Sequence, residues 1–198
     1  MLTQTIELSA LYFGTPVMLI SSLNPDGTSN LSPVSSYWAL EDSLLVGLGT
    51  SGRCYHNLLS QPEAVLNLPD ASLWTNVEAI AATTGCETVP PDKELMGYRF
   101  EPNKFACAQL TPLTSEQVSP LRVLECPVQI EAKLISMHKI GGEDGACSAA
   151  EFRALRVHVH TQLLNKVGRI SLKHWKPLYY VFRHYHTLGA CLGKNFRA

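Results

Sequence analysis

The segment of this sequence with the clearest chemical potential is TSGRCYHN, residues 50–57. Ser51 is a candidate N-cap for a helix over residues 51–61 that ends before Pro62. The first N–H groups of such a helix are unpaired, and its dipole is positive at that end. Thr50 and Ser51 add hydroxyl donors and Arg53 adds a forked cation, which together suit a phosphate. A capped helix with a solvated arginine is the alternative interpretation, and the spacing alone favours it.

A second polar segment, NLSPVSS over residues 30–36, lies within a stretch that otherwise reads as extended. Pro33 cannot donate to a strand ladder, so it predicts a sheet edge or a bulge. The unpaired N–H and C=O groups of such an edge suit a planar heteroaromatic ring. A plain polar edge strand is the alternative interpretation.

The sequence offers little sign of metal or nucleophilic chemistry. His158-x-His160 and His184-x-His186 each place two imidazoles on one strand face, but no third ligand follows at a metal-binding spacing. We therefore expect no metal site, and interpret these histidines as exposed or facing a partner. No nucleophile elbow, phosphate-binding P-loop, dinucleotide fingerprint or zinc-protease motif occurs, and no catalytic residue is predicted.

The elements that must position these residues are mostly strands. NPDG at residues 24–27 predicts a turn between antiparallel strands, and a period of two recurs over residues 126–134 and 155–163. Helices do not follow the strands regularly, which disfavours a doubly wound parallel sheet. We predict a mainly β chain, a closed antiparallel barrel with interposed α-helices. The strands are expected at 16–23, 28–40, 43–48, 63–68, 126–134, 155–163 and 177–186, helices at 51–61 and 71–84, and loops at 86–102 and 141–145.

Composition places the chain among ordinary globular proteins. Its 198 residues are 45% hydrophobic, no apolar run approaches the length of a membrane span, and the first residues lack the basic start of a signal peptide. The six cysteines form no C-x-x-C pair, and because no secretory signal is seen, we expect reduced thiols and a cytoplasmic location.

The net charge of −1 hides two unlike parts. Residues 153–198 hold nine Lys and Arg and no Asp or Glu, whereas residues 1–152 sum to −10. This asymmetry indicates an anionic ligand or a self-complementary assembly.

Taken in order, these segments resemble the flavin reductase-like family of the FMN-binding split barrel, with Greek-key-like antiparallel strands. The resemblance covers about residues 12–190 as a single domain, 1–198, with residues 71–102 as a helical and loop insertion. The segments that carry it are 16–27, NLSPVSS at 30–36, 44–48, 51–57, EAVLNLP at 63–69, Lys104-Phe105, LECPV at 124–128, WKPLY at 175–179 and YHTLG at 185–189.

The resemblance implies noncovalent FMN, NADH or NADPH as reductant, and a homodimer with flavin near the subunit interface. Hydride would pass to the flavin N5, and the cofactor itself would carry the redox chemistry. By position, the ring and ribityl chain would be lined by Asn30, Ser32, Pro33, Val34, Ser35 and Ser36. The phosphate would be held by Thr50, Ser51, Arg53 and Asn57. A loop would add Thr83 and Thr84, and the closing strand, of the same or the neighbouring subunit, Tyr185 and His186.

Two alternatives stay open. The first is a non-enzymatic FMN-binding protein that transfers electrons or carries flavin to a partner. The second is a module that binds nucleic acid or another anion through its basic tail. The Lys and Arg of that tail alternate with apolar strand residues and do not cluster, so nucleic acid is disfavoured. We expect no membrane partner.

Overall fold

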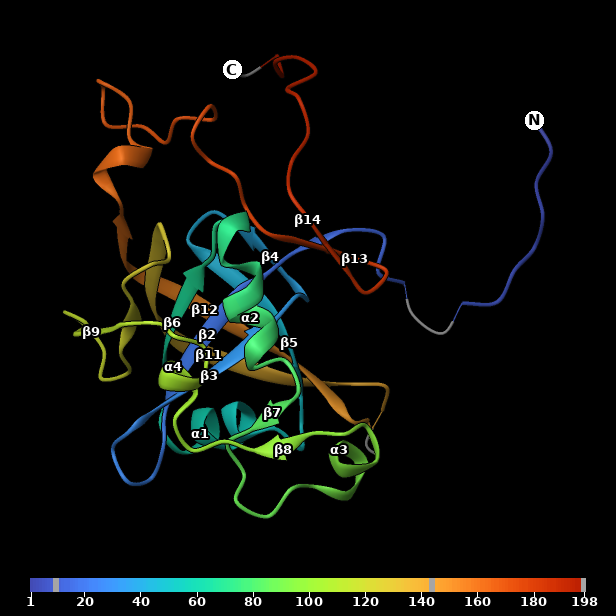
Figure 1. Cartoon of the computed structure of the whole chain (residues 1–198), viewed down its shortest axis with the longest axis vertical. Coiled ribbons are helices and arrows are strands. Elements are labelled where there is room, and N and C mark those ends of the chain that lie inside the picture. Colours follow the sequence, from blue (N-terminus) through green and yellow to red (C-terminus); the bar gives the residue numbers. More distant parts are fainter. Residues whose placement is uncertain (9–10, 143–144, 197–198) are drawn as a thin grey trace.

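A seven-stranded antiparallel sheet forms the centre of the computed structural model, which describes residues 1–8, 11–142 and 145–196 (Figure 1). Its strand order is β3-β2-β6-β11-β12-β5-β4. These strands are β2 (Met18–Leu23), β3 (Ser29–Val34), β4 (Tyr37–Leu40), β5 (Ser43–Gly49), β6 (Glu63–Leu68), β11 (Val128–Ile140) and β12 (Cys147–Val159).

The sheet curls on itself because its two edge strands are consecutive in the chain. Only Ser35 and Ser36 separate β3 from β4, and the Gly47 N–H of β5 donates to the Ser36 carbonyl at 2.6 Å. Among the described residues no ladder joins β3 to β4, so the barrel is split at this point and not closed as we expected. The prediction of a mainly β, antiparallel architecture is confirmed.

Two hydrophobic cores lie on opposite sides of the sheet. In β2, Met18 and Ile20 pack into one core, whereas Leu19, with Val17 just before the strand, packs into the other. This is the period of two expected of a strand covered on both faces. The core that contains Met18 and Ile20, here called the inner core, is completed by Cys54 and Leu58 from helix α1 (Arg53–Ser60). The core that contains Leu19, here called the outer core, is covered by α2 (Trp74–Ala79), by α4 (Lys104–Cys107), and by the short strand β10 (Arg122–Val123).

The remaining elements lie at the rim of the sheet. These elements are β1 (Thr15–Pro16), η1 (Ala71–Leu73), β7 (Thr83–Thr84), α3 (Pro91–Leu95), β8 (Arg99–Phe100), β9 (Pro112–Leu113), η2 (Thr161–Leu163), β13 (Tyr179–Val181) and β14 (His184–His186). Figure 1 shows that α1, β7, β8 and α3 lie at the same end of the molecule. No helix in the described segments has the length and apolar character needed to cross a membrane.

Several local predictions need correction. The stretch 86–102 is not only loop, because it holds α3 and β8. The final strand over 177–186 is a hairpin of β13 and β14, and the strand over 155–163 ends at Val159, before η2. The helix over 51–61 is confirmed as α1, but its N-cap is Gly52 without a side-chain bond, and not Ser51. The loop predicted at 141–145 includes residues 143–144, which lie outside the described residues.

Candidate functional site

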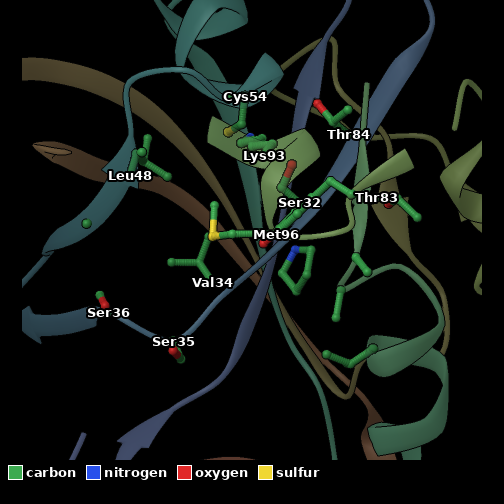
Figure 2. Close-up of a pocket in the computed structure, with 18 of the residues that line it drawn as sticks. Ser32, Val34, Ser35, Ser36, Leu48, Cys54, Thr83, Thr84, Lys93 and Met96 are labelled. Carbon is green, nitrogen blue, oxygen red and sulfur yellow. The ribbon is translucent and has the colours of Figure 1, made fainter. Parts of the chain in front are cut away.

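A cavity of about 710 Å³ opens where the split in the barrel meets the N-terminus of α1 (Figure 2). That volume lies within the range of small-molecule sites. Its walls come from the end of β3, the end of β5, the first turn of α1, β7 and the α3 segment. In Figure 2, Lys93 of α3 and Met96 directly after it reach into the same space as Ser32 and Cys54.

One wall is the polar edge strand that the sequence singled out. Ser32, Pro33 and Val34 at the end of β3, and Ser35 and Ser36 after it, all line the cavity. Proline has no backbone N–H to donate to a neighbouring strand. Because β3 is an edge strand, no strand on its free side needs such a donor from Pro33.

The opposite wall is the N-terminus of α1, whose first N–H groups are unpaired by helix geometry. Gly52 precedes the helix and lies beside a cation, since a Cβ placed on it would be 3.3 Å from Lys93 Nζ. Arg53 begins the helix, and its Nε donates to the Gly85 carbonyl at 2.9 Å. The Ser51 hydroxyl donates to Asp92 Oδ2 at 2.9 Å. Two cations therefore stand at a helix end that is itself electropositive.

Gly85 allows Arg53 and Asn30 to pack against its backbone. A Cβ at this position would lie 2.6 Å from Asn30 Oδ1 and 3.0 Å from Arg53 Cγ, closer than real Cβ contacts. Asn30 itself is buried and donates from Nδ2 to Ser32 Oγ at 3.0 Å. Because Gly85 has no side chain, it leaves room for the Arg53 side chain and for Asn30, which in turn holds the Ser32 hydroxyl in the strand wall.

Lys104 is the least expected residue of the site. Lys104 is 3% exposed yet lines the cavity, and among the described residues its Nζ has one hydrogen-bond contact, a long one of 3.5 Å to the Thr83 carbonyl. Burial lowers the pKa of Lys104 to about 8. Burial also raises the pKa of the neighbouring Cys54 thiol to about 11, so that thiol is neutral and is not an activated nucleophile.

The charges that line the cavity favour an anion. Its described lining holds four cations (Arg53, Lys93, Lys104 and Arg183) against two carboxylates (Glu78 and Asp92). Each carboxylate accepts a hydroxyl hydrogen bond, from Tyr185 and from Ser51 respectively. An elongated, partly apolar molecule with a phosphate at one end matches this arrangement.

Most of the residues predicted from sequence meet at this cavity. It is lined by Ser32, Pro33, Val34, Ser35, Ser36, Ser51, Arg53, Thr83, Thr84 and Tyr185. Asn30 lies behind this wall and contacts it through Ser32.

Three predicted residues lie elsewhere. The Thr50 hydroxyl donates to the Ala146 carbonyl at 3.2 Å. Asn57 is one turn into α1, buried, and its amide donates to Ser22 and Asn24. His186 lines a second, adjoining cavity. None of the three is among the residues lining the first cavity.

Sequence reasoning missed the cations that other segments contribute. Lys93 comes from the insertion, Lys104 from α4, and Arg183 from the turn between β13 and β14. Lys104 and its neighbour Phe105 belong to the resemblance described above, but only the fold brings that lysine to α1. The tyrosines Tyr12, Tyr98 and Tyr180 also line the cavity.

The histidine pairs have ordinary partners. His158 Nε2 is 2.6 Å from Glu131, and His160 Nε2 is 2.8 Å from the Leu124 carbonyl. His184 Nδ1 is 2.9 Å from the Phe182 carbonyl. Within the described part of the chain, no three His, Cys, Asp or Glu side chains gather as they would around a metal ion.

Fold and cavity together describe a split barrel with a cation-lined cavity between the edge strand and the first helix. The chain belongs to the flavin reductase-like family, because the family model for the "Flavin reductase like domain" matches residues 10–189. Membership of this family supports a flavin-related oxidoreductase.

Individual relatives extend the likeness over nearly the whole chain. The protein YdfE of Bacillus subtilis (strain 168) is 39% identical over 193 residues, covering 98% of this chain and 93% of its own. Flavoredoxin of Desulfovibrio vulgaris (Miyazaki F) has a TM-score of 0.80 at 21% identity, covering 100% of this chain and 99% of its own. Nitrilotriacetate monooxygenase component B of Bacillus cereus has a TM-score of 0.76 at 24% identity, covering 92% and 88%. At these identities the two structures establish the fold alone.

Proposed function

We propose that the protein binds FMN noncovalently in this cavity and acts as an NAD(P)H-dependent flavin reductase or oxidoreductase. The observation that carries the proposal is the pairing of two unlike walls, the edge strand over Ser32–Ser36 and the cationic start of α1. A flavin mononucleotide has the matching pair of ends, a planar ring and a phosphate.

The phosphate of FMN carries nearly two negative charges at neutral pH and would lie at the N-terminus of α1. The Nε of Arg53 is held by the Gly85 carbonyl, which aims the guanidinium without using its terminal amino groups. Lys93 lies beside Gly52 and adds a second cation. A helix end, a forked guanidinium and an ammonium are a common set for phosphate.

The ring would lie against the edge strand. The backbone of Ser35 lies between β3 and β4 and outside both ladders, and Val34 and Met96 supply apolar contact. The flavin, when bound, supplies hydride acceptance and transfer at N5, so the protein needs to hold and orient the ring and needs no acid–base pair. Thr83 and Thr84 line the side of the cavity nearer Lys104.

A homodimer, a cytoplasmic location, and a contribution of Tyr185 or His186 from the neighbouring subunit stay predictions from the sequence.

A second function deserves a test because a structure named flavoredoxin is among those most similar in fold. On this alternative the protein binds FMN but exchanges electrons with a protein partner and not with a nicotinamide. Both functions predict a yellow protein. Anaerobic addition of NADH and NADPH separates them, since the enzyme reduces its flavin and the carrier leaves it oxidised with both reductants.

The phosphate assignment is tested by Arg53→Ala. We expect FMN affinity to fall about tenfold to a hundredfold, because a charge-assisted hydrogen bond contributes roughly 1.5–3 kcal/mol. Riboflavin has no phosphate and should bind within twofold of the wild type. Both constants come from quenching of flavin fluorescence, with Arg169→Ala as the matched control, since Arg169 is exposed and lines neither cavity. Equal losses for both flavins would remove Arg53 from this role.

A further inference from the structure

A second cavity of about 570 Å³ adjoins the first on the side of the C-terminal hairpin. The two share three lining residues, Glu78, Arg183 and Tyr185. The two cavities therefore adjoin at these residues. A second substrate that must meet a ligand held in the first cavity needs such a connection.

One side of the second cavity is an aromatic platform. Trp74 is 48% exposed, and its ring lies 6.1 Å from that of Tyr185 at an angle of 43°. The Tyr185 hydroxyl donates to Glu78 Oε2 at 2.9 Å, which fixes the tyrosine and occupies the carboxylate. A half-exposed indole beside a fixed phenol is a surface on which a purine ring stacks.

The turn that carries Arg183 is strained. Val181 pairs with His184, so Phe182 and Arg183 form a two-residue hairpin loop, and their φ angles are +43° and +70°. Positive φ at both positions favours Asn and Gly, and bulky side chains there cost free energy. Phe182 has a packing reason to be present, because its ring lies 5.0 Å from that of Phe13 and its N–H donates to the Tyr12 carbonyl.

Arg183 has no such packing reason. Its side chain is exposed at the junction of the two cavities, and no hydrogen bond or ion pair within the described part of the chain occupies it. His184 and His186 line the same cavity, and the one carboxylate in its described lining, Glu78, already accepts a hydrogen bond from Tyr185. An arginine kept in an unfavourable conformation at this place is explained by an anionic ligand.

We propose that the second cavity binds the adenosine diphosphate half of the nicotinamide reductant, with the adenine on Trp74 and the pyrophosphate on Arg183. The inference rests on the proposed function, since it assigns a subsite for its second substrate. The nicotinamide end would then extend into the first cavity past Tyr185. Arg183 is a specificity-determining residue on this account and takes no part in hydride transfer.

The test uses ADP-ribose, which carries the adenine and the pyrophosphate without the nicotinamide. Binding is measured by calorimetry on the purified wild-type protein and on Arg183→Ala, Arg183→Gly and the control Arg169→Ala, each with and without FMN. We expect both Arg183 variants to weaken ADP-ribose binding tenfold or more and the control to leave it unchanged. The KM for NAD(P)H, measured with the protein saturated with FMN, should rise by a similar factor, and by more than kcat falls.

Arg183→Gly distinguishes a binding role from a structural one. Glycine adopts a positive φ freely, so this variant should raise the melting temperature by about 2–4 °C while it loses ADP-ribose binding. Unchanged ADP-ribose binding in both variants would overturn the proposal, as would a wild-type protein that does not bind ADP-ribose. If FMN does not bind, the proposed function is wrong. The ADP-ribose measurement on the flavin-free protein then still decides whether the second cavity binds adenosine diphosphate.

Discussion

Replacing Lys104 with methionine should stabilise the protein at neutral pH and remove part of the pH dependence of its stability. The ammonium group is buried in the cavity wall with one long contact to the Thr83 carbonyl, and no carboxylate in the described residues forms an ion pair with it. Such a charge is costly to bury without a counter-ion. Methionine has a similar length and no charge, so it keeps most of the packing.

The magnitude follows from the pKa of Lys104. Burial lowers it from the ordinary 10.5 to about 8, and a difference of that size corresponds to about 3 kcal/mol at pH 7. Below pH 8 the lysine is protonated in both the folded and the unfolded protein, so the full cost is present. Between pH 8 and 10.5 the unfolded chain binds more protons, and the free energy of unfolding therefore rises with pH. The cost falls by about 2 kcal/mol between pH 7 and 9.5.

Urea unfolding of the flavin-free protein at pH 7, 8, 9 and 9.5 measures this effect. The useful quantity is the difference in unfolding free energy between Lys104→Met and the wild type, because the pH-dependent contributions of titrating groups common to both proteins largely cancel in that difference. Burial raises the pKa of the Cys54 and Cys126 thiols, so in both proteins these thiols make the free energy of unfolding fall as the pH rises. The stabilisation should be largest at pH 7 and shrink by about 2 kcal/mol by pH 9.5. Lys133→Met, at an exposed position on β11, is the control and should show no such trend. Parallel profiles for Lys104→Met and the wild type would refute the assignment of a buried, uncompensated ammonium.

Two further predictions concern residues around the site and the sheet. Gly85→Ala should weaken riboflavin binding, and FMN binding more, by tenfold or more in fluorescence titration, because its Cβ would displace both Asn30 and Arg53; affinities within twofold of the wild type would show that these contacts yield freely. Glu131→Gln should lower the free energy of unfolding by roughly 1–3 kcal/mol at pH 7. Burial raises the pKa of Glu131, but hydrogen bonds from two backbone N–H groups and from His158 outweigh burial and hold that pKa below its usual value. The loss should therefore diminish as the pH falls through and below about 4.5, and a constant difference across pH 3–7 in chemical unfolding would contradict it.

The strands and the first turn were predictable because their signals are local. The turn at residues 24–27 joins β2 to β3, and Gly27 has the positive φ of +83° that such a turn requires. The apolar run before it became the fully buried β2, and the helix over 51–61 became α1. Periodicity and turn chemistry depend only on neighbouring residues, so a single sequence carries them.

The polar face of β11 shows what such signals omit. Its alternation places Gln129 and Glu131 opposite the apolar residues, yet both side chains are buried. The reason lies elsewhere in the chain, since the backbone of Glu116 and Gln117 donates to Glu131 and the Arg122 guanidinium donates to Gln129. A period of two predicts a strand with two unlike faces, but not which loop covers them.

The site was predictable where it lies on one segment and not where it joins several. The edge strand and the start of α1 carry their chemistry in contiguous residues. Lys93, Lys104 and Arg183 reach the cavity from three distant segments, and no spacing rule relates them. Asn57 shows the converse error, because proximity in sequence to the helix start did not bring its side chain to the cavity.

The basic tail now has a more specific explanation than its net charge allowed. Two of its arginines pair with acids from the earlier part of the same chain, Arg153 with Asp42 at 3.9 Å and Arg156 with Glu116 at 3.2 Å. The cations at the start of α1 come from the part of the chain whose net charge is negative, so the tail does not make the proposed phosphate site. Arg183 is the one tail arginine or lysine that lines either cavity among the described residues, and its turn holds it there at a conformational cost. A change of tail charge at Arg183 should therefore alter use of the reductant, whereas the same change at Arg169 should not.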